Sequence, residues 1–251
     1  GTTTDATNNV AIGYKALEDV TTGDSNVAIG QSAMKGLTTG QYNTAVGQNA
    51  LQTLTSGGLD NVAVGMYALG FSTSGDNNTA TGNYALYKNT TASENVGIGR
   101  SANSQNVTGT GNTSVGSYAS EKNNISTNNT SIGHASTRYM FGTDNVSVGK
   151  DALTGATFTE TGGVYNNDPT ITHTADSRII AGLGVSGTGI PNGAYISSIT
   201  DSTHFELSAS TTGGSLSSQT LTFYSRSIGS VAIGTSALAA LTSGAGNTVV
   251  G

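Results

Sequence analysis

Cysteine and tryptophan are absent from this chain of 251 residues, and proline occurs only twice. Without cysteine there is no disulfide framework and no thiolate metal site. Only 10% of the residues are charged, and nine basic residues against fifteen acidic ones give a formal net charge of −6. Because the sequence offers no basic stripe that could neutralise phosphates, we expect no nucleic-acid partner.

Long apolar runs and a signal peptide are also missing, so we expect no membrane insertion. The chain opens and stops within a repeating pattern, from which we expect a segment of a longer protein. Gly, Thr, Ser and Asn dominate the composition, which is a polar mixture typical of disordered chains. Val and Ile nevertheless recur in register, and a disordered chain has no need of such order.

A pentapeptide of the form Asn-Val-Ala-Ile-Gly recurs about every seventeen residues. The better copies begin at Asn9, Asn26, Asn43 and Asn61. Degenerate copies begin at Asn78, Asn95, Asn112, Asn129, Asn145, Ser230 and Asn247. A short fixed period predicts stacked units rather than one globular core, and this period suits one coil of a parallel β-solenoid.

The slots of the pentapeptide differ in size. The residue before Gly is almost always a β-branched aliphatic, and the residue two earlier alternates between Val and Thr. Two such positions share one face of a strand, which we expect to be buried. The slot between them holds Ala, Ser or Gly in all but the last copy, so something must pack closely against it. That neighbour is either the narrow interior of the coil or a homo-oligomer axis, and we favour the axis.

After the Gly corner comes a second apolar segment, in which Ala is usually followed by Leu or Met. Polar residues replace this Leu in the middle copies at Asn103, Ser120 and Thr137. We expect either partner chains or a looser shaft there, because the chain alone buries little apolar surface. The Asn that opens each pentapeptide is either a turn residue or one member of a hydrogen-bonded ladder along the stack.

The repeat is interrupted once, so we divide the chain into a solenoid shaft over 1–155, an inserted domain over 156–223 and a resumed solenoid over 224–251. The insertion predicts a small antiparallel β-meander. Its candidate strands cover residues 178–185, 194–199, 204–208 and 219–224.

Exposed aromatic residues with polar neighbours are common in glycan-binding sites. The candidate glycan- or receptor-binding residues lie in the insertion: Tyr165, Asn166, Asp168, Tyr195 and Phe205. The three histidines are scattered without ligand spacing, and no pattern pairs the acidic residues of the insertion. We therefore expect no catalytic residue, no cofactor and no metal site.

The motif Asn-Val-Ala-Ile-Gly, followed by Ala-Leu and Thr-Thr-Gly, resembles the repeats of bacteriophage tail fibres and related phage adhesins. It is also similar to the head repeats of trimeric autotransporter adhesins, although the period is shorter there. The resemblance covers 1–155 and 224–251. In the insertion, the stretch from Gly187 to Gly193, followed by Ile196 and by Phe205 to Ser208, looks like a small β-module of phage tail proteins.

These resemblances imply a homotrimeric, non-catalytic fibre segment with a structural and host-attachment role. The expected location is the extracellular tail fibre of a virion, and the expected partner is a glycan or protein of the host cell surface. Three alternatives remain open: a trimeric adhesin on the bacterial surface, a purely structural filament subunit, and a polysaccharide-degrading tail spike, whose chemistry requires paired carboxylates.

Overall fold

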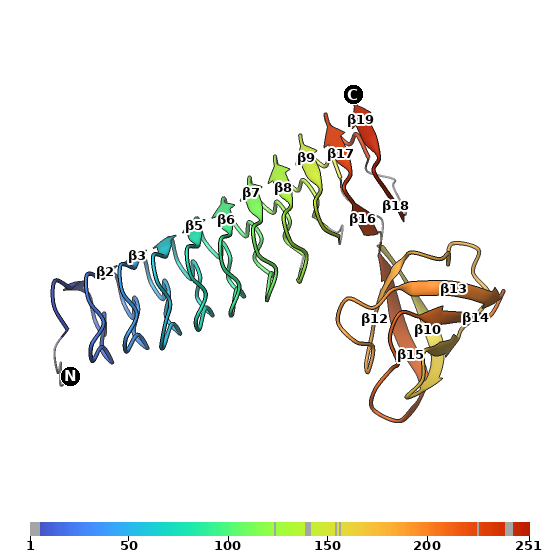
Figure 1. The fold of residues 1–251 in the computed structure, drawn as a ribbon, viewed down its shortest axis with the longest axis horizontal. Helices are drawn as coiled ribbons and strands as arrows, with labels where there is room; N and C mark the ends of the chain where they lie inside the picture. Colours follow the sequence, from blue (N-terminus) through green and yellow to red (C-terminus); the bar gives the residue numbers. More distant parts are fainter. Residues whose placement is uncertain are drawn as a thin grey trace.

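The computed structural model describes residues 6–122, 124–138, 142–153, 155, 157–224, 226–238 and 243–251. Within these ranges the chain is all β and contains no helix. It forms a rod of stacked parallel coils, with an antiparallel sheet attached near the C-terminal end of the rod (Figure 1). The predicted fold class, a β-solenoid with an antiparallel β-domain, is therefore confirmed, while the trimer stays a prediction.

One wall of the rod is an eleven-stranded parallel sheet whose strands follow the order of the chain. Its three-residue strands are β1 (Val10–Ile12), β2 (Val27–Ile29), β3 (Thr44–Val46), β4 (Val62–Val64), β5 (Thr79–Thr81), β6 (Val96–Ile98), β7 (Thr113–Val115), β8 (Thr130–Ile132), β9 (Val146–Val148), β17 (Val231–Ile233) and β19 (Thr248–Val250). A second parallel pair, β16 (Arg226–Ile228) and β18 (Ser243–Ala245), belongs to the last coils. At about 4.8 Å per strand, the rod is about 50 Å long.

Equivalent residues of successive pentapeptides lie directly beside one another along the rod. Ala11 pairs with Ala28 and Ile12 with Ile29, both in parallel register. The same alignment holds in every later pair, including β9 with β17 on either side of the insertion. The side chains therefore form the columns that the sequence predicts.

The Asn residues that precede the strands form a continuous buried ladder. Asn26 is typical: its backbone N–H donates to Oδ1 of Asn9 over 2.8 Å, and its Nδ2 donates to the same oxygen over 3.2 Å and to the Gly40 carbonyl over 2.9 Å. The pattern repeats along the stack as far as Asn145. The ladder interpretation is confirmed, because each amide satisfies backbone groups of neighbouring coils that water cannot reach.

The small slot of the pentapeptide faces the inside of the coil, and the β-branched slots face outwards. Ala28, Ala45 and Ala63 are 0% exposed within a single chain, whereas Ile12 is 58% and Ile98 is 41% exposed. Our preference for an oligomer axis at the small slot, and for burial of the Val and Ile face, was therefore wrong for the isolated chain. The physical reason is the width of the coil, since only a small side chain fits between the strand and the opposite wall.

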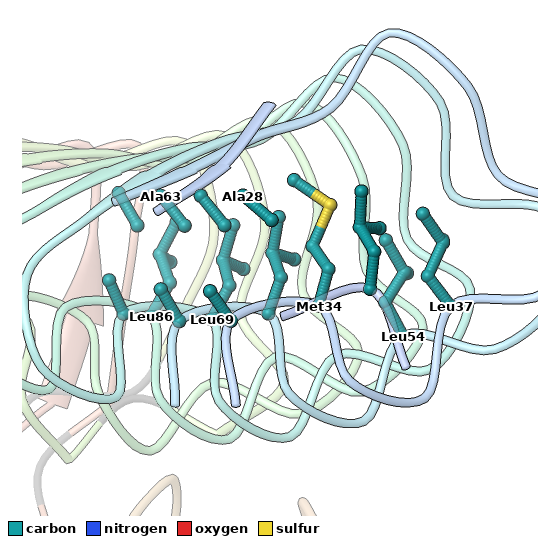
Figure 2. Close-up of a cluster of buried hydrophobic side chains, with 14 of the residues drawn as sticks. Ala28, Met34, Leu37, Leu54, Ala63, Leu69 and Leu86 are labelled. Atoms are coloured by element: carbon teal, nitrogen blue, oxygen red, sulfur yellow. The ribbon is translucent and has the colours of Figure 1, made fainter. Parts of the chain in front are cut away.

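The interior of the first coils is apolar. Figure 2 shows Ala28 and Ala63 on one wall, with Met34, Leu69 and Leu86 reaching towards them from the other. Leucines at the next turn close the side of this core, and Leu37 and Leu54 are fully buried there. This stack of apolar layers buries apolar surface in spite of the polar composition of the chain.

The interior becomes polar in the later coils. Asn103, Ser120 and Thr137 take the places of leucines and are buried. Ser120 Oγ donates to Ser131 Oγ over 2.7 Å, and Ser131 is in turn 2.7 Å from Thr137 Oγ1. At Ser120 and Thr137 the coil keeps its shape and exchanges apolar contacts for hydroxyl hydrogen bonds within the chain, whereas the buried side-chain amide of Asn103 makes no hydrogen bond to the residues that the structure describes.

The inserted domain is a six-stranded antiparallel sheet. Its strands are β10 (Thr157–Asn166), β11 (Thr170–Thr172), β12 (Gly184–Ser186), β13 (Ile196–Asp201), β14 (His204–Leu207) and β15 (Ser215–Tyr224), in the order β12-β15-β10-β11-β14-β13. The predicted meander is wrong, because β15 lies between β12 and β10. Predicted strands near β13, β14 and β15 are confirmed, but most of 178–185 is not a strand. Asp176 begins a turn there, which its carboxylate stabilises by accepting the Arg178 N–H over 2.9 Å.

Both ends of the insertion meet at one place beside the rod. Thr157 pairs with Tyr224 in the first register position of β10 and β15. Residue 156, where the predicted boundary falls, lies outside the described residues. The loop before β13 also approaches the shaft, since a Cβ on Gly193 would lie 2.5 Å from Cδ1 of Ile125. The insertion therefore leaves and re-enters the stack without disturbing the register of β9 and β17.

Enlarging the small inward slot tests the width of the coil. We expect Ala63→Leu to lower the free energy of unfolding by about 1–3 kcal/mol, because a well-packed core has no room for the extra methylenes. In the same column a Cβ on Gly97 would already lie 2.9 Å from Cγ of Leu86. The matched outward change, Val64→Ile, introduces a residue that this column already holds at Ile98 and should shift stability by less than about 0.5 kcal/mol. Equal urea-unfolding midpoints for the two variants would contradict the assignment of the two faces.

Candidate functional site

The five candidate recognition residues lie in three different parts of the inserted domain. Tyr165 and Asn166 end β10, Asp168 follows them in the turn to β11, Tyr195 precedes β13, and Phe205 lies on β14. Tyr165 and Phe205 belong to the core, and Asn166 and Asp168 lie at an exposed turn. Tyr195 lies near the point where the chain returns to the rod. They do not converge on one surface.

Tyr165 and Phe205 are core residues. Tyr165 is 3% exposed, and its hydroxyl donates to the carbonyl of Thr188. Burial raises the pKa of this phenol. Phe205 is 0% exposed and its ring lies 5.9 Å from that of Phe223. The expectation that these two rings are exposed is corrected, because alternate residues of β10 and β14 must fill the space beneath the sheet.

Asn166 and Asp168 are exposed, but their turn is held by its own hydrogen bonds. The Asp168 carboxylate accepts the Thr170 N–H over 3.2 Å, and its carbonyl accepts the Thr211 N–H over 3.0 Å. Between them, the Asn167 side chain accepts the N–H of Gly214 over 2.8 Å. These contacts fix the turn beside the neighbouring loop, and they leave the Asn166 side chain at the surface.

Tyr195 is half-buried and carries a cation on its ring. The guanidinium carbon of Arg226 lies 4.1 Å from the ring centroid, a cation–π contact that links the insertion to the strand re-entering the rod. Arg226 also lines a small pocket with Ile125 of the shaft and Asn192 of the insertion. Tyr195 therefore lies near the junction of the two parts rather than at the far tip.

A pocket of about 310 Å³ was missed by the sequence interpretation. It lies between the turn after β11 and the turn joining β13 to β14, and its lining includes His173, Asp176, Ile179, Ile199 and Asp201. No spacing in the sequence links these two turns, because they meet only through the pairing of β11 with β14. The ligand-sized pocket is thus a product of strand order, which the predicted meander did not have.

The two carboxylates of this pocket are already occupied as acceptors. Asp176 binds the Arg178 guanidinium, whose hydrogen bond lowers the pKa of the carboxyl group. Asp201 accepts the Thr203 N–H over 2.7 Å and lies 2.9 Å from Nδ1 of His204, and these bonds, with the Thr203 N–H first, lower its pKa to about 2. Neither carboxyl group is suited to donate a proton near neutral pH, as the acid of a glycosidase must.

A buried polar pair lies behind the pocket. The His173 side chain is 2% exposed, and its Nδ1 donates to the Thr174 carbonyl over 2.6 Å. Both carboxylate oxygens of Glu160 are buried, and one lies 3.6 Å from the same Nδ1. The ring of His173 packs 5.1 Å from that of Phe205. These groups belong to the core of the domain, and His173 among them lines the pocket.

Among the residues that the structure describes, no cluster of three His, Asp or Glu side chains could hold a metal ion. His134 lies on the shaft, whereas His173 and His204 lie on β-domain elements. The same part of the chain has no helix of the length and apolarity that a membrane crossing requires.

Comparison of the chain with protein-family models, with curated proteins and with solved structures finds no match. The molecule is a rod whose outer face carries columns of Val, Ile and Thr, and its attached domain has a pocket lined by both polar and apolar side chains.

Proposed function

We propose that this chain is a non-catalytic segment of a bacteriophage tail fibre, in which three copies form a rigid shaft that presents the inserted domains to a host surface. The observation that carries the proposal is the outer face of the eleven-stranded sheet. Columns of Val, Ile and Thr run along this face without interruption, and Val62, Ile98 and Ile132 are each 37–41% exposed. Charged residues are absent from these columns.

Such a face favours association of identical rods. An apolar stripe that continues over about 50 Å exceeds what a soluble monomer usually leaves uncovered. Because every copy carries the same columns at the same spacing, parallel rods can match layer to layer about a symmetry axis. The homotrimer is thus proposed at the β-branched columns and not at the small slot.

The inserted domain is the proposed recognition element of each copy. Both of its ends join the rod at one place, so the loops that do not contact the shaft can vary without altering the stack of coils. Its pocket places the polar side chains of Asp176, Asp201 and Ser202 beside the apolar walls of Ile179 and Ile199, which is a mixture that suits a sugar. Three copies on one shaft raise avidity for a repeating host glycan.

Deleting the inserted domain tests attachment separately from assembly. Because Thr157 pairs with Tyr224 and β9 pairs with β17, residues 156–223 can be replaced by a direct join. We expect the intact segment to have the mass of three chains in solution and to bind, when fluorescently labelled, to a subset of a panel of bacterial strains. The deletion variant should keep that mass and its β circular dichroism while losing cell binding.

Substitutions on the outer columns provide the control for assembly. Ile98→Glu with Ile132→Glu should give folded monomers, since both side chains point away from the coil. Ile98→Thr with Ile132→Thr should preserve the trimer, because Thr81 occupies the same column naturally. A well-folded monomer of the unmodified segment would refute the trimer, and undiminished cell binding after deletion would favour a structural filament whose insertion is dispensable.

A further inference from the structure

A strip of aromatic and basic side chains runs along the shaft beside the Gly corner. It lies outside the inserted domain, which holds all the candidate recognition residues predicted from the sequence. Its aromatic end comprises Tyr67, Phe71, Tyr84 and Tyr87, on the coils that contain β4 and β5. Tyr67 and Tyr84 are stacked with their centroids 5.5 Å apart, and Tyr87 packs edge-on against Tyr84 at 5.1 Å. The three tyrosines are half-buried, and Phe71 is 46% exposed.

The basic end of the strip follows on the next coils. Tyr118 lies between two guanidinium groups, with the carbon of Arg100 at 5.4 Å and that of Arg138 at 4.9 Å from its ring centroid. Arg138 and Lys122 both contact Glu121, at 2.6 and 3.6 Å. Lys150, 64% exposed in its side chain, extends the strip towards the insertion.

Backbone hydrogen bonds hold the two ends in one line. The Tyr84 N–H donates to the Met66 carbonyl over 3.0 Å. In the same way, the Ser101 N–H donates to the Asn83 carbonyl and the Tyr118 N–H to the Arg100 carbonyl, each over 2.9 Å. The corner residues of successive coils are thus fixed at the spacing of the stack. From Tyr67 to Lys150 the strip covers five such steps, or about 24 Å.

The charge of the strip is opposite to that of the rest of the chain. Its basic end holds four of the nine basic residues, Arg100, Lys122, Arg138 and Lys150, and two of the fifteen acidic ones, Glu121 and Asp151. The basic end of the strip therefore has a formal charge of +2, and the rest of the chain has −8, which together give the net charge of −6. The other acidic residues of these coils, Glu94 and Asp144, precede the strands and so lie at the opposite corner.

We propose that this strip binds an anionic polysaccharide of the host surface, with carboxylates of the polymer on Arg100, Lys122 and Lys150 and sugar rings against the tyrosines. Arginine and lysine pair with carboxylates, and tyrosine offers an apolar ring with a polar end. Basic groups separated by uncharged residues match a polymer that carries a charge on only some of its sugars. A nucleic acid, charged at every nucleotide, would demand a denser basic surface.

This inference deepens the proposed attachment role, but its test uses purified polymers and no cells. We expect the full chain to bind hyaluronan and polygalacturonate in affinity electrophoresis at low salt, to leave neutral dextran unbound, and to release both polyuronates as salt is raised. Arg100→Gln with Lys150→Gln should weaken this binding about tenfold. Lys15→Gln with Lys35→Gln, which removes two lysines bound to Glu18 in the first coils, should change it less than twofold.

Folding and assembly are checked by circular dichroism, thermal midpoint and solution mass, which both double variants should leave unchanged. Failure of both polyuronates to bind, equal losses in the two double variants, or tighter binding of oligo(dT) than of either polyuronate would each overturn the proposal. If polyuronates bind but cells do not, the strip stands and the attachment role falls. If cells bind through the insertion and polyuronates do not bind, only the strip proposal falls.

Discussion

Replacing Gly82 by alanine is expected to lower the free energy of unfolding by about 3 kcal/mol or more. Gly82 has φ = +128° and directly follows β5 at the corner of the coil. A Cβ placed there would lie 2.7 Å from both the carbonyl carbon and the oxygen of Gly99 in the next coil. These are backbone atoms, so the clash cannot be relieved by a side-chain rotation. Backbone strain and overpacking each cost about 1–3 kcal/mol.

The matched control is Gly57→Ala, at a glycine with left-handed φ but no neighbour. Gly57 has φ = +77°, and an added Cβ would meet nothing within 4 Å. Gly57→Ala should therefore lower the free energy of unfolding only by the conformational strain, which is about 1–2 kcal/mol. Urea unfolding followed by circular dichroism gives both values. A loss for Gly82→Ala no greater than that for Gly57→Ala would show that successive glycine corners are not in contact.

The shaft could be predicted from the sequence because it repeats a local rule. Each coil places the same residue types at the same offsets, so the period and the columns followed from comparing one copy with the next, whereas the Asn positions were compatible with either a turn residue or a ladder. The direction in which each slot faces did not follow. Ala beside Ile indicates a strand with two unlike faces, but only the closeness of the opposite wall decides that Ala63 points inwards and Val64 outwards.

The inserted domain was harder to predict because its order depends on long-range pairing. Strand β10 contains Gly162 and Gly163, and its register with β15 shifts on either side of Gly163. This bulge reverses the alternation of inward and outward residues within the strand. Tyr165 consequently points into the core, although its polar neighbours gave it the pattern of an exposed residue. The pocket between Asp176 and Asp201 could not be predicted either, because the pairing of β11 with β14 is what brings its two turns together.

Removing one amide from the Asn ladder is expected to be nearly as damaging as filling a glycine corner. The Asn78 side chain is 0% exposed, accepts the Asn95 N–H over 3.0 Å, and donates to Asn61 Oδ1 over 3.1 Å and to the Ala92 carbonyl over 2.9 Å. We expect Asn78→Ala to lower the free energy of unfolding by about 3 kcal/mol, which combines the lost bonds with one buried orphan donor.

The identity of that orphan explains the size of the effect. The Ala92 carbonyl keeps a bond from Asn89 Nδ2 at 2.8 Å, and Asn61 Oδ1 keeps the Asn78 N–H at 2.9 Å. Only the Asn95 N–H loses its ladder acceptor, and burial keeps water from replacing it. Asn78→Ser should recover part of the loss, because Ser230 fills the ladder position before β17 and accepts the Asn247 N–H over 3.3 Å. If Asn78→Ala and Asn78→Ser unfold at the same urea concentration, acceptance of the Asn95 N–H is not what stabilises the coil.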